Sequence, residues 1–188
     1  MKRQHGFTLT EMLVVSTIVA ILLGIGVPSY RYITNSYRIS GEVNSLLGDM
    51  QYARAEALRE GQFVTVCISN DGQTCDGAGV NWARGWIVFS DPNGNATVDG
   101  GETVLKVQQA FLGTNPDTFN ANNGLGAVTY NREGFATTQA GFPDATITLH
   151  EPSANAAWTR CLWINPMGVP RAATPSTVAD TGAEVCNR

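Results

Sequence analysis

The N-terminal third of the chain carries two successive patterns of apolar residues. From Met12 to Val27 the chain is uncharged and rich in Leu, Ile and Val, and residues 7–9 extend this run on its N-terminal side. A helix needs roughly 20 mostly apolar residues to cross a bilayer. The run therefore predicts a membrane-spanning helix, in which Glu11 is the single formal charge between Phe7 and Tyr30.

Beyond Pro28 the pattern becomes amphipathic. Apolar residues recur at spacings of three and four, which places them on one face of a helix; they are Ile39, Val43, Leu46, Met50, Ala53 and Ala57. We expect this face to pack against a sheet and the helix to run from about Phe7 to Glu60, where Gly61 ends it. Near the outer end of the span, Gly24, Gly26 and Pro28 are expected to interrupt the helix.

The remaining residues predict short strands, which are rich in Val, Ile, Thr and aromatic residues and are separated by Gly, Asn, Asp and Pro. The expected strands are Gln62–Ser69, Trp82–Phe89, Thr103–Gln109, Gly126–Tyr130, Ala145–His150 and Trp158–Ile164. Two long loops are expected at 113–125 and 166–186. No helix alternates with these strands, so we predict an α+β fold in which the long helix packs on a meandering antiparallel β-sheet.

Length and charge narrow the class of protein. The 188 residues suffice for one anchored helix and one globular head, because a domain takes about 150 residues. After Gly61 six basic residues face eleven acidic ones, so the head carries a net charge of −5. This balance is the opposite of the basic surface that nucleic-acid binding requires.

Glu11 requires a partner. A carboxylate in hydrocarbon costs roughly 2.5 to 3.5 kcal/mol on insertion scales, and no Lys or Arg lies within a turn or two of it. The cation must come from another chain or from a newly formed amine. The sequence before it consists of a short basic leader with Lys2 and Arg3, then Gly6 and Phe7.

This order of residues resembles the class III signal of type IV prepilins and type II secretion pseudopilins. The resemblance implies that a prepilin peptidase cuts between Gly6 and Phe7 and methylates the new amine of Phe7. It also implies that Glu11 pairs with the Phe7 amine of a neighbouring subunit. The alternatives are a secretory signal, which should end in a small-x-small cleavage site after a shorter apolar core, and a plain membrane anchor, which has no use for Glu11.

The resemblance divides the chain into four segments. Residues 1–6 form a cleaved leader, which Lys2 and Arg3 keep on the cytoplasmic side. Residues 7–28 form the transmembrane or filament-core helix, residues 29–61 its amphipathic half, and residues 62–188 a β-rich periplasmic head with a disulfide-clipped tail. The protein is thus expected in the bacterial inner membrane as a single-pass precursor, and afterwards at the pilus tip on the cell surface.

Motifs in the head are similar to those of the GspH, FimT and FimU group of minor pilins and pseudopilins. They are 51–57, 85–89 with Asp91 and Asn93, 101–105, 130–135, and 161–164 leading to Gly168. We favour a FimU-like minor pilin that joins other minor pilins and the major pilin in a tip complex and helps to initiate type IV pilus assembly, with roles in twitching motility and adhesion. A GspH-like pseudopilin of a type II secretion system shares every one of these motifs.

All four cysteines fall in the head. An even number in an oxidising compartment favours disulfides, and four cysteines allow three pairings. We expect the pairs that are local in sequence, Cys67 with Cys75 and Cys161 with Cys186. A zinc site is the alternative, but no Cys-x-x-Cys occurs and only His150 remains once the leader is removed.

The sequence offers little for catalysis or cofactor binding. It has no Gly-x-Ser-x-Gly, phosphate loop or His-Glu-x-x-His motif, so we expect a structural protein without a cofactor. A calcium site is the alternative, because oxygen-bearing side chains follow EF-hand-like spacing; they are Asp91, Asn93, Asn95, Asp99 and Glu102. Ala96 replaces the required glycine, so a turn is the preferred interpretation.

DNA binding is the alternative function that makes the most specific demand on the sequence. FimT-like members that bind DNA for natural transformation carry a Gly-Arg-x-Arg pair, whose guanidinium groups bind phosphates. The corresponding residues here are Gly168-Val169-Pro170-Arg171, so one arginine is missing. DNA contact would require Arg171 to converge with Arg160 and Arg188, with the tail folded back through its cysteine.

Overall fold

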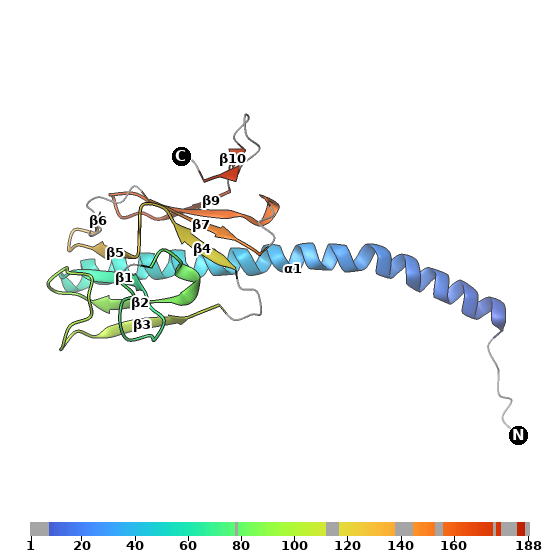
Figure 1. The fold of residues 1–188 in the computed structure, drawn as a ribbon, viewed down its shortest axis with the longest axis horizontal. Coiled ribbons are helices and arrows are strands. Elements are labelled where there is room, and N and C mark those ends of the chain that lie inside the picture. Colours follow the sequence, from blue (N-terminus) through green and yellow to red (C-terminus); the bar gives the residue numbers. More distant parts are fainter. Residues whose placement is uncertain are drawn as a thin grey trace, which may run out of the picture. The chain divides into compact units, whose positions relative to one another are not determined.

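The computed structural model describes residues 8–77, 79–111, 117–137, 145–152, 156–174, 176–177 and 184–186. The chain divides into two compact units, Met1–Arg38 and Ile39–Arg188. Helix α1 (Leu9–Glu60) contributes its first half to the first unit and its second half to the second unit, which we call the head (Figure 1).

Local signals fix both ends of α1. At its start the Thr8 hydroxyl oxygen accepts a hydrogen bond from the Glu11 backbone N–H at 3.2 Å, which satisfies one of the free donors of the first turn. At its end Gly61 adopts φ +67°, the left-handed conformation that favours glycine after a helix. The expected end at Glu60 is confirmed, but the expected interruption is wrong, because α1 is helical through Pro28. A proline removes one hydrogen bond, and the others suffice here.

The head contains a five-stranded antiparallel sheet in the order β3-β2-β1-β5-β6. Its elements are β1 (Val64–Ile68), β2 (Gly85–Ser90), β3 (Val104–Gln109), β5 (Ala127–Tyr130) and β6 (Ala136–Thr137), with the 3-10 turn η1 (Trp82–Arg84) before β2. Strand β1 lies at the centre and is buried throughout. Strand β5 pairs with β1 rather than with the strand that precedes β5 in the chain, so the sheet is not a simple meander.

A second antiparallel sheet has the order β4-β7-β8-β9. Its strands are β4 (Thr118–Ala121), β7 (Ala145–His150), β8 (Arg160–Ile164) and β9 (Arg171–Ala173), with the 3-10 turn η2 (Ala156–Trp158) before β8; β10 (Ser176–Thr177) pairs separately with β11 (Glu184–Val185). The expected single sheet is therefore wrong. Strands β4 and β9 lie in stretches that were expected to be loops. Strand β4 pairs with β7, which is distant in sequence, whereas β9 pairs with the preceding strand β8.

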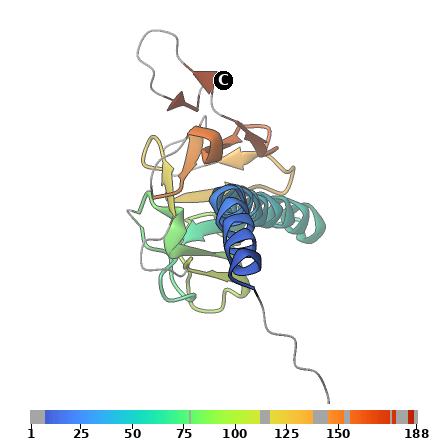
Figure 2. The same ribbon diagram turned by 90° about the vertical axis from the view of Figure 1, so that its right-hand side faces the viewer.

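One core joins the second half of α1 to both sheets. All six apolar residues of the predicted stripe, from Ile39 to Ala57, are buried in it. They meet Trp86 and Val128 of the first sheet and Ile147 and Leu162 of the second. In Figure 2 strands β1–β3, in green, and β7–β8, in orange, lie one above the other beside the helix. The α+β fold with a long helix packed on antiparallel sheets is confirmed.

A smaller apolar cluster covers the opposite face of the five-stranded sheet. Cys67, Ile87 and Phe89 form its buried centre, and Cys75 and Val98 pack against them. We call it the outer cluster. It explains why β1 and most of β2 are buried on both faces, although antiparallel sheets commonly leave one face to water.

Candidate assembly interface and binding sites

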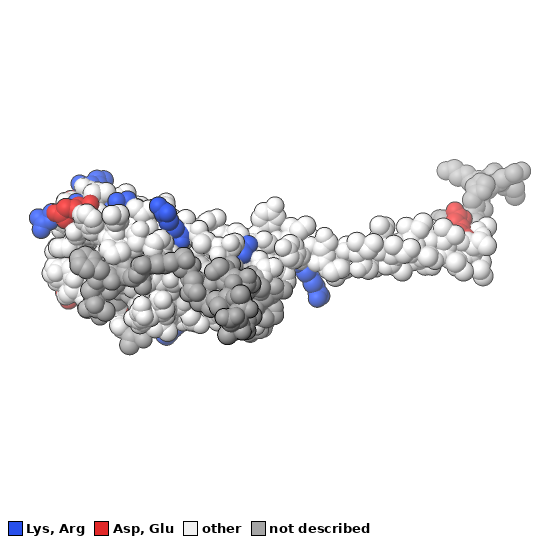
Figure 3. Space-filling view, turned by 90° about the horizontal axis from the view of Figure 1, so that it is seen from above, with Lys and Arg blue, Asp and Glu red and all other residues white. Residues whose placement is uncertain are grey.

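The first unit presents an uncovered apolar helix. Large apolar side chains are exposed along it from Leu9 to Val27 and beyond, and the helix is long and apolar enough to cross a membrane. Figure 3 shows a continuous uncharged surface along most of the N-terminal half of α1. Such a surface is unfavourable in water, so it must be covered by lipid or by other helices.

Glu11 lies in the first turn of this helix. Its backbone N–H is capped by Thr8, and a carboxylate at this position interacts favourably with the helix dipole, by about 0.3 to 1 kcal/mol. Within the described residues its carboxylate has no hydrogen-bond or ion-pair partner. Gly6 and Phe7 lie outside the described residues, so the cleavage site, the methylated amine and its pairing with Glu11 stay predictions.

Both cysteine pairs are bonded in the structure in the expected combination. Cys67 of β1 bonds Cys75, eight residues later, and Cys161 of β8 bonds Cys186, with Cα–Cα distances of 5.6 Å in each. The first bond closes a short loop beside the outer cluster. The second joins the C-terminal segment to the four-stranded sheet.

Asp71 organises the loop that the Cys67–Cys75 bond closes. Its carboxylate accepts hydrogen bonds from the Thr74 hydroxyl at 2.7 Å and from the backbone N–H groups of Gln73 and Thr74 at 2.8 Å. The Thr74 hydroxyl contributes most to holding the pKa of Asp71 well below its usual range. This geometry identifies Asp71 as a turn-forming residue, because all of these donors are local.

The loop considered for calcium is held by hydrogen bonds among its own side chains. Asp91 is buried, and its Oδ2 accepts from the Thr65 hydroxyl at 2.7 Å and from the Ala96 N–H at 2.9 Å. Asp99 Oδ2 accepts from the side-chain amides of Asn93 and Asn95 at 2.9 and 2.8 Å, which lower the pKa of Asp99.

This arrangement favours the turn over a calcium site. Glu102 accepts a hydrogen bond from the Asp99 N–H at 2.8 Å, so it too serves the loop backbone. Ala96 takes the left-handed conformation, φ +57°, at the position where an EF-hand carries glycine. Among the residues that the structure describes, no three or more His, Cys, Asp or Glu side chains are grouped so as to hold a metal ion. The turn stays the preferred interpretation, and calcium binding stays the alternative.

The three arginines considered for DNA contact do not share one surface in the described part of the chain. Arg160 lies opposite Leu149 of β7, on the face that carries the buried core residues. Arg171 lies opposite Trp163, three positions further along β8, and residues an odd number apart point to opposite faces of a sheet. Arg188 lies outside the described residues.

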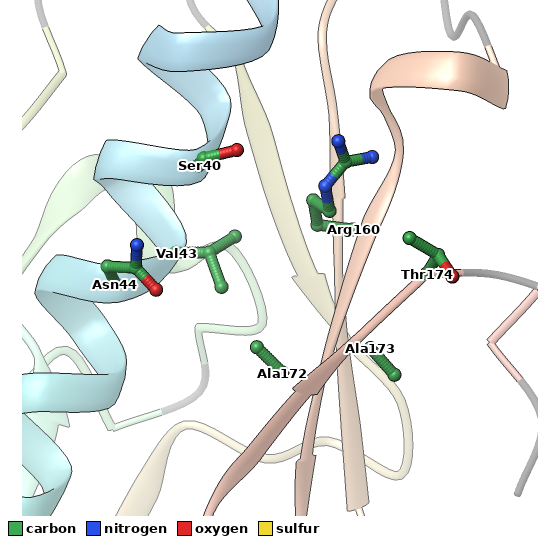
Figure 4. Close-up of a pocket in the computed structure, with 7 residues that line it drawn as sticks. All are labelled: Ser40, Val43, Asn44, Arg160, Ala172, Ala173 and Thr174. Atoms are coloured by element: carbon green, nitrogen blue, oxygen red, sulfur yellow. The ribbon is translucent and has the colours of Figure 1, made fainter.

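A hollow lies in the head between α1 and strand β9 (Figure 4). Its lining residues are Ser40, Val43 and Asn44 of α1, Arg160 of β8, and Ala172, Ala173 and Thr174 in and after β9. Sequence reasoning identified Arg160 as a cation but missed this setting. Only the register of β7 with β8 reveals that its position faces the helix.

Sequence reasoning also missed a buried charge in the core. Asp49 of α1 is 1% exposed, and its Oδ2 accepts a hydrogen bond from Trp86 Nε1 at 2.8 Å. Lys106 of β3 forms an ion pair with Oδ1. These contacts join the helix to two strands and serve the stability of the head.

Comparisons with known proteins agree with this architecture. A family model described as "Type II transport protein GspH" matches residues 42–168, and one described as "Prokaryotic N-terminal methylation motif" matches residues 1–27. The pilin-like protein PilA1 of Thermus thermophilus is 31% identical over 99 residues, which cover 53% of this chain and 56% of PilA1. The chain thus spans little more than half of that relative.

Two crystal structures of the type IV minor pilin FimU of Pseudomonas aeruginosa PAO1 share the fold. They match with TM-scores of 0.51 and 0.53 at 15% and 16% identity, covering 71% and 77% of this chain and 91% and 92% of the FimU chains. At this identity the likeness shows the fold alone. The GspH model spans well over half of the chain, which therefore belongs to the GspH family of prepilin-type minor pilins and pseudopilins, structural subunits rather than enzymes.

Proposed function

We propose that the protein is a FimU-like minor pilin, which joins other minor pilins in a complex at the tip of a type IV pilus and helps to initiate assembly. The observation that carries this proposal is the exposed apolar half of α1 with its single carboxylate, Glu11. A subunit with such a helix stays in the inner membrane before assembly and exchanges lipid for neighbouring helices in the filament.

Processing creates the cation that Glu11 lacks. Cleavage between Gly6 and Phe7 by a prepilin peptidase leaves the amine of Phe7 as the new N-terminus, and N-methylation keeps it protonatable. The Glu11 carboxylate of one subunit then binds the Phe7 amine of its neighbour, which removes the cost of roughly 2.5 to 3.5 kcal/mol for an unpaired carboxylate in an apolar layer. Because only one such pair exists in each contact, it fixes the axial register between the two helices.

The head serves association on the outer side of the membrane. Its two disulfides suit an oxidising compartment such as the periplasm. Its fold is shared with the FimU crystal structures, so the head has the architecture that the proposed minor pilin requires. Twitching motility and adhesion would depend on the protein indirectly, through the pili that it helps to initiate.

A pseudopilin of a type II secretion system is the second candidate, favoured by the description of the matching family model. The same helix, leader and Glu11 would then assemble a short pseudopilus. The two candidates differ in the machine that they serve, because their assembly chemistry is shared. The phenotype of a strain that lacks the protein distinguishes the two candidates.

The deciding experiment compares a deletion strain with its parent and a complemented strain. Surface pili are sheared and quantified, and secreted proteins are measured from the same cultures. Loss of pili that complementation restores is expected. Normal pili together with a depleted secretome would replace the proposal by the pseudopilin.

Two substitutions test the mechanism within the filament. Gly6→Val should block cleavage and leave the precursor at its full mass. Glu11→Ala should be cleaved normally yet enter sheared filaments at a reduced level, and Thr10→Ala serves as the neighbouring control with wild-type behaviour. A Glu11→Ala protein that enters filaments at the wild-type level would contradict the pairing with Phe7.

A further inference from the structure

The hollow between α1 and β9 has a volume of about 270 Å³ and lies wholly within the head. Figure 4 shows the side chains of Ser40 and Val43 on the helix pointing across it toward Arg160 and β9. Short side chains leave this space between the helix and the strand. Ala172, which lies opposite the buried Leu162, is too small to reach the helix, and Ser40 is no larger on the other side.

Arg160 brings a positive charge into this hollow. Its side chain is half-buried, on the inward face of β8, where Leu149 on the neighbouring strand is fully buried. Its Nη1 donates hydrogen bonds to the backbone carbonyls of Ala157 and Thr159, at 3.0 and 2.8 Å. These acceptors are neutral, and they hold the guanidinium in place without balancing its charge.

No carboxylate of the described residues forms an ion pair with Arg160. Other cations of the head do have acidic partners, such as Arg84 with Asp76 at 3.3 Å and Lys106 with Asp49. A partly desolvated charge without a counter-ion is unfavourable, because its lost hydration is not replaced. Since no described carboxylate of the head fills this role, the geometry suits a negative group supplied by a partner.

The number and kind of polar groups that line the hollow indicate which chemical class of ligand it binds. A guanidinium carries five N–H donors, and the two hydrogen bonds of Nη1 leave Nε and Nη2 for a carboxylate that binds side on. The other polar linings, Ser40, Asn44 and Thr174, are uncharged. One cation matches one carboxylate, whereas a nucleic-acid backbone requires several cations and is repelled by a head of net charge −5.

We propose that this hollow is a docking site for an Asp or Glu side chain of a neighbouring pilin-like subunit, and that Arg160 binds that carboxylate. The proposal rests on the proposed function only in taking the partner to be another pilin subunit. It applies equally to a pilus and to a pseudopilus. It is also independent of Glu11, because the head residues alone form the site.

The test uses the full-length chain, tagged and produced in its own organism. The tagged protein is purified from detergent-solubilised membranes, and the other pilin-like subunits that accompany it are quantified by mass spectrometry. Arg160→Glu should lower the amount of one such subunit by about tenfold or more, as expected when one partner of a buried charge pair is reversed. Arg132→Glu, a charge reversal on an exposed arginine elsewhere on the head, should leave all amounts unchanged.

Charge reversal in the partner completes the test. In the Arg160→Glu background, each Asp and Glu of the lost subunit is replaced by Lys in turn, and one replacement should restore co-purification. Wild-type amounts with Arg160→Glu, or the failure of every replacement, would overturn the proposal. Loss of binding to a labelled DNA duplex with Arg160→Glu, at unchanged subunit amounts, would likewise overturn it in favour of nucleic acid.

A second variant distinguishes loss of the docking site from misfolding of Arg160→Glu. Ala172→Leu fills the hollow and leaves Arg160 in place, so it should lower the same subunit while both disulfides still form. If Ala172→Leu folds and co-purifies with every subunit normally, the docking site is refuted. The pilus count of the deletion strain is scored separately, so a failure of the priming role does not affect this result.

Discussion

Replacement of Lys106 by Met tests the buried charge that ties α1 to the five-stranded sheet. The substitution keeps the apolar stem and removes the ammonium group. The Asp49 carboxylate would then stay buried with its hydrogen bond from Trp86 Nε1, at 2.8 Å, and without its ion pair. Removing one partner of a buried pair costs roughly 3 to 5 kcal/mol.

The exposure of Lys106 reduces this figure. Its side chain is 51% exposed, whereas that of Asp49 is 2% exposed, so water already screens the cation but not the anion. We therefore expect Lys106→Met to lower the free energy of unfolding by about 1.5 to 3 kcal/mol. Asp49→Asn should cost only about 1 kcal/mol, because the amide oxygen can still accept from Trp86 and Lys106 can turn to water.

The double variant Asp49→Asn/Lys106→Met should be more stable than Lys106→Met alone, since it leaves no buried charge. Urea unfolding of the full-length protein in detergent measures all four proteins, and the fluorescence of the buried Trp82 and Trp86 reports the head. Urea is preferred to guanidinium because it does not screen charges. A double variant less stable than Lys106→Met would refute the reasoning.

Three further predictions use the same urea assay. Tyr130 is buried and its hydroxyl has no hydrogen-bond partner in the described structure, so Tyr130→Phe should stabilise the head by about 1 kcal/mol; a loss of that size would reveal a hidden partner. Gly85→Ala should destabilise by about 2 kcal/mol or more, because φ is +103° and a Cβ would lie 2.6 Å from the Gln108 carbonyl oxygen, whereas Gly100→Ala, with no atom within 4 Å, should be neutral. Because the pKa of Asp71 is depressed in the folded state, its stabilisation is present above its unfolded pKa of about 3.9 and is lost as the pH falls. The difference in urea midpoint between wild type and Asp71→Asn should thus shrink from about pH 6 toward pH 3, and a constant difference would contradict this role.

Periodicity made much of the fold predictable. The stripe from Ile39 to Ala57 follows helical spacing, and each of its six members is buried. Strand β7, Ala145–His150, has the predicted bounds because apolar and polar residues alternate along it. The end of α1 was predictable because Gly61 follows a long helical pattern.

Other parts of the fold could not be predicted, mainly because strand pairing depends on residues that are distant in sequence. Strand β4 was missed because its partner is distant; Thr118 lies opposite His150, and no local pattern records this. Strand β9 was missed for a different reason: it pairs with the preceding strand β8, but its three residues, Arg171–Ala173, carry no strand pattern of their own. Arg160 was recognised as a cation, but its inward position depends on the register of β7 with β8.

The outer cluster bears on when the subunit becomes complete. Cys75 packs against the cluster of Cys67, Ile87 and Phe89, and a disulfide ties its loop to Cys67. In a reducing compartment only non-covalent contacts, such as the hydrogen bonds of Asp71, hold that loop, so we expect the second apolar face of the sheet to be exposed to water and proteases more often. We expect oxidation to act as a quality check on the supply of subunits: a chain that is not oxidised is degraded before it can occupy a place in an assembly.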